Sequence, residues 1–242
     1  MSDNQLRLVW IYPDLLSTYG DQGNALVIER RARQRGLDVA RLDVRSDQPI
    51  PTSGDIYLIG GGEDRPQRLA AERLRRDGHL YQAVQNGAIV FAVCAGYQIL
   101  GHEFVNDLGQ REPGLGLLDV TTVRNEGERC VGDVLADIDP RLGLPQLTGF
   151  ENHQGITHLG PTARPFAKVR LGKGNGTGDG TEGAYNDTVF GTYMHGPALA
   201  RNPQIADLLL KLALDVNALP PIDDRWYEAL RDERIAAAQQ PA

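Results

Sequence analysis

Cysteine is scarce in this chain, which carries only Cys94 and Cys130 in 242 residues. Two cysteines cannot form the disulfide framework of a small secreted domain, so their scarcity favours a reducing cytoplasm. The polar stretch Met1–Gln5 lacks a signal-peptide pattern, and no apolar run approaches the roughly 20 residues that a membrane-spanning helix needs. We therefore expect a cytoplasmic protein without membrane insertion.

An excess of basic residues is also missing, because the formal net charge is −7. This balance argues against nucleic acid or an anionic membrane surface as the partner. The glycine-rich stretch 172–176 lacks the Gly-Lys-Ser/Thr ending of a phosphate-binding loop and does not open a helix. No Cys/His cluster has zinc spacing. We expect no metal and no cofactor in this chain.

The apolar content of 41% and the length support one large α/β domain, alone or with an appended subdomain. In the first hundred residues, expected strands alternate with expected helices, which predicts a doubly wound, mostly parallel sheet with flanking helices. The strands are expected at 6–12, 38–43, 56–59 and 88–93. The second half, from 117 to 195, reads mainly as short strands separated by Gly, Pro and Asp, which predicts an added β-rich portion.

The C-terminal part is predicted to be helical. Asn202-Pro203 is a typical helix start, and that helix should end near Asp215. After Pro220-Pro221 a last amphipathic helix is expected over 224–239, with Trp226 on its apolar edge. We predict one domain over 1–216 and a C-terminal helical extension over 217–242; the extension is expected to pack on the domain, with partner docking as the alternative.

An uninterrupted apolar run leads into Cys94 and is followed by Ala95, Gly96 and a helical pattern. A run without polar alternation is typical of a strand buried on both faces. A strand that turns sharply into a helix at a nucleophile is the elbow of many hydrolases, and the helix N-terminus favours thiolate there. The alternative is a buried structural thiol.

A cysteine nucleophile needs a base, and acyl transfer needs donors for the developing oxyanion. His195 follows a strand-like run and precedes Gly196-Pro197, so we predict it as the base; a packed or surface histidine is the alternative. The N–H of Ala95 and the glycine triplet 60–62 after the neighbouring strand are the candidate oxyanion donors.

Several motifs together resemble the class I glutamine amidotransferases of the cobyric-acid-synthase-like branch. Within that branch they resemble the glutaminase subunits that pair with a separate Mur-ligase-like enzyme. The motifs are Tyr12–Asn24, Gly60-Gly61-Gly62 with Glu63-Asp64-Arg65, Cys94-Ala95-Gly96-Tyr97-Gln98, Phe150-Glu151-Asn152-His153 and Gly191–Pro197. The resemblance covers about Leu6 to Val216.

The resemblance implies that Cys94 attacks the side-chain amide of glutamine to form a thioester and that His195 releases ammonia. It also implies substrate binding by Arg129 and Gln98, with Gly61 and Ala95 as oxyanion donors. A MurT-like ligase would use the ammonia, with ATP and Mg on that partner, to amidate the D-glutamate α-carboxylate of lipid II in peptidoglycan synthesis. The expected assembly is a heterodimer.

One position departs from the family pattern. Many class I amidotransferases carry a glutamate two residues after the histidine, where this chain has Pro197. Either Glu151 or another carboxylate of this chain replaces it, or the partner supplies it. We favour the partner, which predicts weak glutaminase turnover by the isolated chain.

Three other functions remain possible from the sequence. They are a stand-alone γ-glutamyl-type cysteine hydrolase, which the missing glutamate disfavours, a glutaminase for amidation of a cobalamin precursor, and a non-catalytic binding module of the same fold.

Overall fold

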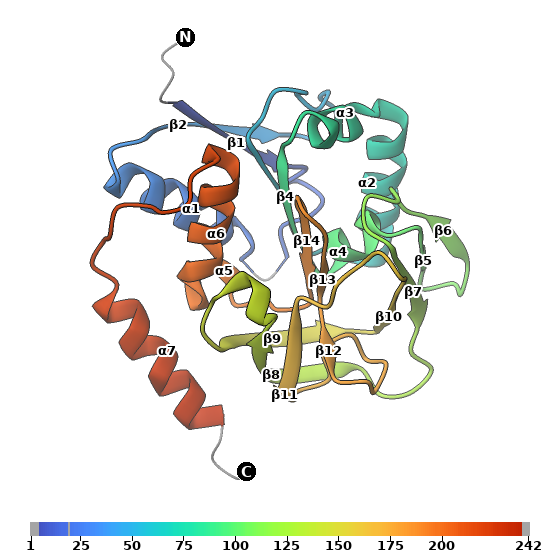
Figure 1. Ribbon diagram of the computed structural model, residues 1–242. Coiled ribbons are helices and arrows are strands. Elements are labelled where there is room, and N and C mark those ends of the chain that lie inside the picture. Colours follow the sequence, from blue (N-terminus) through green and yellow to red (C-terminus); the bar gives the residue numbers. More distant parts are fainter. Residues whose placement is uncertain (1–4, 19, 239–242) are drawn as a thin grey trace.

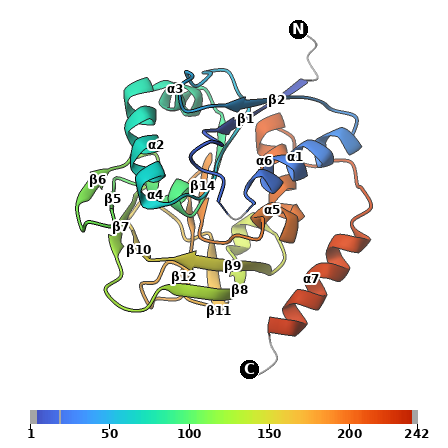
Figure 2. The same cartoon turned by 180° about the vertical axis from the view of Figure 1, so that it is seen from behind.

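The computed structural model describes residues 5–18 and 20–238 and contains a central six-stranded sheet (Figures 1 and 2). Its strand order is β13-β14-β4-β3-β1-β2, and every neighbouring pair is parallel except β13 with β14. The strands are β1 (Gln5–Ile11), β2 (Asp38–Val44), β3 (Ile56–Ile59), β4 (Ile89–Val93), β13 (Ala184–Tyr185) and β14 (Val189–Thr192). The predicted mostly parallel, doubly wound sheet is confirmed.

Helices cover both faces of this sheet (Figures 1 and 2). On one side lie α1 (Gln22–Gln34), α5 (Ala198–Arg201) and α6 (Pro203–Leu214), and on the other α2 (Asp64–Asp77) and α3 (His79–Gln85). The short helix α4 (Ala95–Leu100) follows β4 directly and is buried along its whole length. Because β3 and β4 are also entirely buried, the core runs through the middle of the sheet, as uninterrupted apolar strands require.

The segment 103–182 adds two smaller four-stranded sheets beside and below the central one (Figure 1). One has the order β10-β7-β5-β6, with β5 (Glu103–Val105), β6 (Arg111–Pro113), β7 (Val120–Arg124) and β10 (Gly155–Leu159). The other has the order β12-β11-β8-β9, with β8 (Cys130–Ile138), β9 (Leu147–His153), β11 (Ala167–Leu171) and β12 (Thr181–Glu182), and a 3-10 turn at Pro140–Leu142. The predicted β-rich portion is confirmed.

The last helix, α7 (Arg225–Ala238), extends beside the body of the protein (Figure 1). None of its residues is buried, and Trp226 is 83% exposed, so the predicted packing of its apolar edge is wrong at that residue. Its attachment is polar, because the buried Arg31 of α1 forms ion pairs with Asp207 of α6 and with Asp224 just before α7. Among the described residues, no helix is both long and apolar enough to cross a membrane.

The expected elements differ from the observed ones in a few places. The predicted strand 146–158 is two strands, β9 and β10, interrupted at Gln154. The short strands β5 and β6 were not predicted. Asn202 does precede α6, but its side chain makes no cap; instead its Oδ1 accepts a hydrogen bond from the N–H of Thr148 in β9. A tertiary contact thus replaces the local one that the sequence suggested.

Candidate active site

The candidate site lies at one edge of the central sheet, where four neighbouring strands end. In spatial order β14, β4, β3 and β1 are parallel, so their carboxyl ends open at the same edge. His195 follows β14, Cys94 follows β4, the glycine triplet 60–62 follows β3, and Asp21 lies in the segment after β1. The sheet order therefore gathers residues from the two ends and the middle of the chain.

Cys94 lies in a strained backbone conformation between β4 and α4, with φ 54° and ψ −108°. Positive φ is costly for a residue with a side chain and is found where function requires it. The turn is held by the Cys94 N–H, which donates to the Thr192 carbonyl at 2.8 Å, and by the Gly96 N–H, which donates to Gly60 at 3.2 Å. A Cβ on Gly96 would approach β3 to 2.8 Å, so a small residue is required there. This is the predicted nucleophile elbow.

His195 is held from the other side. Its backbone N–H donates to the Phe150 carbonyl at 2.8 Å, and its carbonyl accepts from the Phe150 N–H at 3.1 Å. Burial alone would lower the pKa of His195, but the neighbouring Asp21 carboxylate and Cys94 thiol favour the charged imidazolium and raise that pKa to about 9. The Cys94 thiol and the imidazole therefore lie close enough to influence each other, and an imidazolium in this place can hold a thiolate beside it and later donate a proton.

Asp21 supplies the carboxylate beside this imidazole. Its Oδ1 lies 3.6 Å from Nδ1 of His195, and its Oδ2 accepts a hydrogen bond of 2.5 Å from the N–H of Gly61. The position that the sequence analysis assigned to a partner carboxylate is thus occupied by a residue of this chain. Glu151 is not the substitute, because its carboxylate accepts from the N–H groups of Lys173 and Gly174.

Pro197, which stands at the usual glutamate position, packs against the start of α1. A Cβ on Gly23, at the start of α1, would lie 2.3 Å from Cγ of Pro197, so Pro197 packs tightly against the segment that carries Asp21. The argument against a stand-alone hydrolase that was based on Pro197 loses its force, because the chain has a carboxylate of its own at His195.

Gly61 lies in the middle of this arrangement. A Cβ built on it would lie 3.0 Å from Cε1 of His195, 3.2 Å from Oδ2 of Asp21 and 3.4 Å from Cβ of Cys94. Only glycine leaves these three side chains together. In this conformation the Gly61 N–H donates to Asp21 rather than toward a substrate oxygen, which differs from the expected oxyanion role. Ala95, the first residue of α4, remains a predicted donor.

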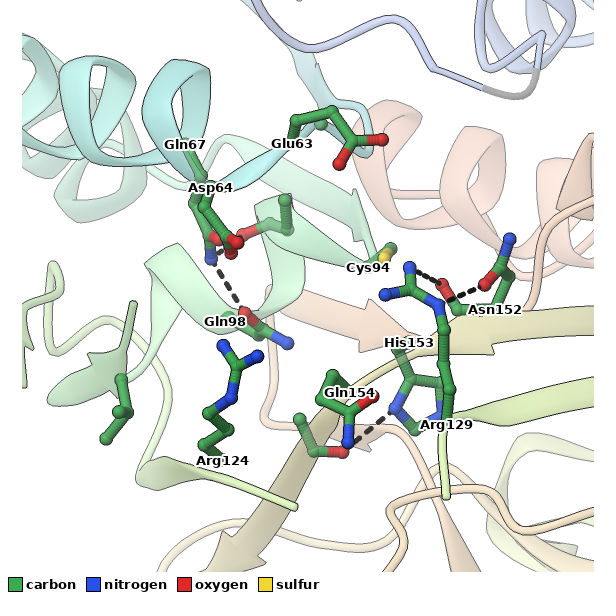
Figure 3. A pocket seen from close by; sticks show the side chains of 14 residues that line it. Glu63, Asp64, Gln67, Cys94, Gln98, Arg124, Arg129, Asn152, His153 and Gln154 are labelled. Atoms are coloured by element: carbon green, nitrogen blue, oxygen red, sulfur yellow. Dashed lines mark hydrogen bonds between the residues drawn. The ribbon is translucent and has the colours of Figure 1, made fainter. Parts of the chain in front are cut away.

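A pocket opens directly over Cys94 (Figure 3). Figure 3 shows the carboxylates of Glu63 and Asp64 above Cys94, the guanidinium of Arg129 beside Cys94, and the guanidinium of Arg124 below Gln98. Burial raises the pKa of Asp64, with a further contribution from the nearby Asp107. Opposite charges across a small pocket match a zwitterionic amino acid, whose ammonium and carboxylate need opposite partners.

Gln98 lines the pocket and is fixed by a buried network. Its Oε1 accepts from Gln67 at 2.7 Å, and its Nε2 donates to the hydroxyl of Tyr193 at 3.0 Å. The Tyr193 hydroxyl also shares a 2.6 Å hydrogen bond with Thr157. A buried amide whose groups are satisfied in this way has one defined orientation, which suits a residue that positions a substrate.

Arg129 also lines the pocket, where the resemblance placed it. Its Nε donates to Oδ1 of Asn152 at 2.5 Å and its Nη2 to the Asn152 carbonyl at 3.2 Å, which orients the guanidinium (Figure 3).

Sequence reasoning missed Arg124 and Asp21. Asp21 lies inside the motif Tyr12–Asn24, in the segment that follows the first expected strand. Because this strand belongs to the same parallel sheet as the strand before Cys94, its position after the strand end is the signal that could have identified Asp21. Within residues 5–18 and 20–238, no group of three or more His, Cys, Asp or Glu is arranged to hold a metal ion.

Comparison with known proteins defines the class. The family model of the CobB/CobQ-like glutamine amidotransferase domain matches residues 7–203, and the chain belongs to this family of glutamine amidotransferases. The fold agrees: a solved glutamine amidotransferase superposes with a TM-score of 0.60 at 20% identity, covering 85% of this chain and 98% of the other.

Two curated relatives are more specific. The chain is 34% identical over 238 residues to the GatD subunit of the glutamine-hydrolysing lipid II isoglutaminyl synthase of Streptococcus pneumoniae, covering 96% of this chain and 89% of the relative. It is 33% identical over 219 residues to the GatD subunit of Staphylococcus aureus, covering 90% and 88%. The relationship to GatD extends over nearly the whole length of both proteins.

Proposed function

We propose that this chain is the glutaminase subunit of a lipid II isoglutaminyl synthase. In this assignment it hydrolyses L-glutamine and delivers ammonia to a MurT-like, ATP-dependent ligase, which amidates the D-glutamate α-carboxylate of lipid II to D-isoglutamine. The observation that carries the glutaminase activity is the meeting of Cys94, His195 and Asp21 beneath a pocket of mixed charge. The acceptor and the partner are inferred from the two GatD relatives.

The proposed chemistry begins with the thiolate of Cys94 beside the protonated His195. The sulfur attacks the side-chain carboxamide carbon of glutamine, and the oxyanion of the tetrahedral intermediate is met by backbone N–H donors. His195 gives its proton to the amide nitrogen and the C–N bond breaks. Ammonia departs, and a γ-glutamyl thioester remains on Cys94. Water then gives a proton to His195 and attacks the thioester carbon, which releases glutamate and restores the thiolate.

Substrate recognition follows from the charges in the pocket. The guanidinium of Arg129, oriented by Asn152, is placed to bind the α-carboxylate, because a guanidinium pairs with a carboxylate through two parallel hydrogen bonds. Arg124 supplies a second positive charge in the pocket, and Asp64 and Glu63 are placed for the α-ammonium. Gln98 would bind the carboxamide end near Cys94.

The decisive experiment measures ammonia release from glutamine by the chain alone and with its ligase partner, ATP and lipid II. The proposal expects ammonia release that Cys94→Ala abolishes and Cys130→Ala leaves intact, together with amidated lipid II when the ligase is present. Ammonia release without amidation under any of these conditions would contradict the acceptor. Hydrolysis of γ-glutamyl conjugates without any response to the ligase would favour the stand-alone hydrolase.

A further inference from the structure

The Asp21 carboxylate contacts two separate parts of the active site. One oxygen faces Nδ1 of His195 at 3.6 Å, and the other accepts the N–H of Gly61 at 2.5 Å. The imidazole comes from the end of β14 and the glycine from the end of β3, so this one side chain bridges the two strand ends that flank the β4 elbow at Cys94.

The position of Asp21 is not explained by the stability of its own helix. It occupies the N-cap of α1, where an aspartate normally accepts a helix N–H, but its side chain makes no cap hydrogen bond. The residue is 2% exposed, and burying a carboxylate is costly unless it is paired and hydrogen-bonded. Its partners are the imidazole and the glycine N–H, so its burial serves the active site.

We propose that Asp21 is the positioning residue of this site, holding His195 in the orientation and charge state that serve Cys94 while fixing the N–H direction of the glycine loop at Gly61. The inference rests on the proposed glutaminase function. It replaces the partner-supplied carboxylate with one from this chain.

The first role follows from the charge. A carboxylate at Nδ1 favours the imidazolium and keeps the other nitrogen, Nε2, for the sulfur and the leaving amide. The titratable groups that act on this imidazole are Asp21 and Cys94, and both favour its protonated form. Without the carboxylate, the pKa of His195 would be lower. A smaller fraction of His195 would then carry the proton that the departing ammonia needs.

The second role concerns the oxyanion donors. Because the Gly61 N–H donates to Asp21, the carboxylate sets the direction of the Gly61 peptide. The bond keeps the glycine loop in one conformation beside Cys94 and His195. The same side chain thus links the charge of the imidazole to the conformation of the glycine loop, and Asp21→Ala removes both contributions.

Two substitutions separate the roles. Asp21→Asn removes the charge but keeps a carbonyl oxygen that can accept the Gly61 N–H, whereas Asp21→Ala removes both. Asp14→Asn is the matched control, because Asp14 lies in the same loop, is exposed, and pairs with Ser46 away from the site. The pKa of His195 is measured by histidine NMR, the reactivity of Cys94 by iodoacetamide, and turnover by ammonia release.

We expect both Asp21 variants to lower the pKa of His195 and to slow alkylation of Cys94 at neutral pH. The kcat should fall by about 10²- to 10⁴-fold, as for other triads that lose their carboxylate, while KM changes by less than about threefold. Asp21→Ala should show the larger loss, and Asp14→Asn should match the wild type. A His195 pKa that is unchanged in both Asp21 variants overturns the proposal. If the wild type releases no ammonia, the proposed function fails, and the NMR and alkylation measurements still decide the role of Asp21.

Discussion

The phenol ring of Tyr193 stacks on the imidazole of His153, with ring centroids 3.7 Å apart and planes 12° apart. Tyr193 lies two residues before the base, and His153 lines the substrate pocket. The stack therefore places Tyr193, in the segment that leads from β14 to His195, in direct contact with His153 in the pocket lining. Both residues are buried, so a change in one is transmitted to the other through direct packing.

The Tyr193 hydroxyl should matter for activity as well as for stability. Tyr193→Phe leaves Nε2 of Gln98 without its acceptor, which should cost about 1–3 kcal/mol of unfolding free energy. Because Gln98 lines the pocket, kcat/KM should also fall by about tenfold. Urea denaturation and ammonia release measure the two effects.

Tyr185→Phe is the matched control, since it removes a buried hydroxyl that donates to Asp139 at 2.8 Å outside the pocket. It should lose stability and keep kcat/KM. Equal loss of activity in the two variants would show that Gln98 is not positioned through Tyr193.

Glu182 should make the stability depend on pH. Burial raises the pKa of Glu182 to about 7 from 4.5. Between these values the folded protein keeps the proton that the unfolded chain releases, so stability should fall as pH rises from about 4.5 to 7. Glu182→Gln keeps an acceptor for the Thr192 hydroxyl and removes the titration.

The measurement is urea unfolding of the wild type and Glu182→Gln across this pH range. The stability of Glu182→Gln relative to the wild type should rise by roughly 3 kcal/mol, and subtracting the two curves cancels every other titration. The exposed Glu126→Gln serves as control and should run parallel to the wild type. A flat difference curve for Glu182→Gln would mean that this carboxyl does not titrate there.

The two cysteines should react very differently with iodoacetamide. Cys94 lines the pocket beside His195, whereas burial raises the pKa of Cys130, with a further contribution from Glu151. Since the thiolate is the reactive form, Cys94 should be alkylated first. Peptide mass spectrometry assigns the labelled site.

His195→Ala should slow this labelling, and glutamine should protect Cys94. Faster labelling of Cys130 than of Cys94 would argue against the assignment of the nucleophile.

The two pocket arginines should affect substrate binding more than chemistry. Arg129→Gln and Arg124→Gln should each raise KM for glutamine by about 10- to 100-fold, because a charged hydrogen bond is worth about 1.5–3 kcal/mol. The kcat should change by less than about threefold if the contact is the same in the ground and transition states. Steady-state kinetics over a range of glutamine concentrations measures both constants.

Arg111→Gln is the control, because Arg111 lies on β6 and pairs with Glu103. Unchanged KM in both pocket variants would remove these arginines from substrate recognition.

Much of this protein is determined by sequence patterns that act locally. The apolar run before Cys94 and the small residues after it specify a buried strand and a tight turn, and the structure contains both. The run before His195 is likewise a central strand. Alternation of strands and helices was enough to predict the sheet, because each element must bury one apolar face.

The order of the strands was decided only by tertiary structure. Asp21 became part of the site because β1 and β14 lie on either side of β3 and β4, which no local pattern specifies. The hydrogen bond between Asp21 and Gly61, and the packing of Pro197 on Gly23, likewise join residues far apart in the chain. The sequence by itself therefore determined the nucleophile and its base, whereas long-range packing decided which carboxylate lies beside them.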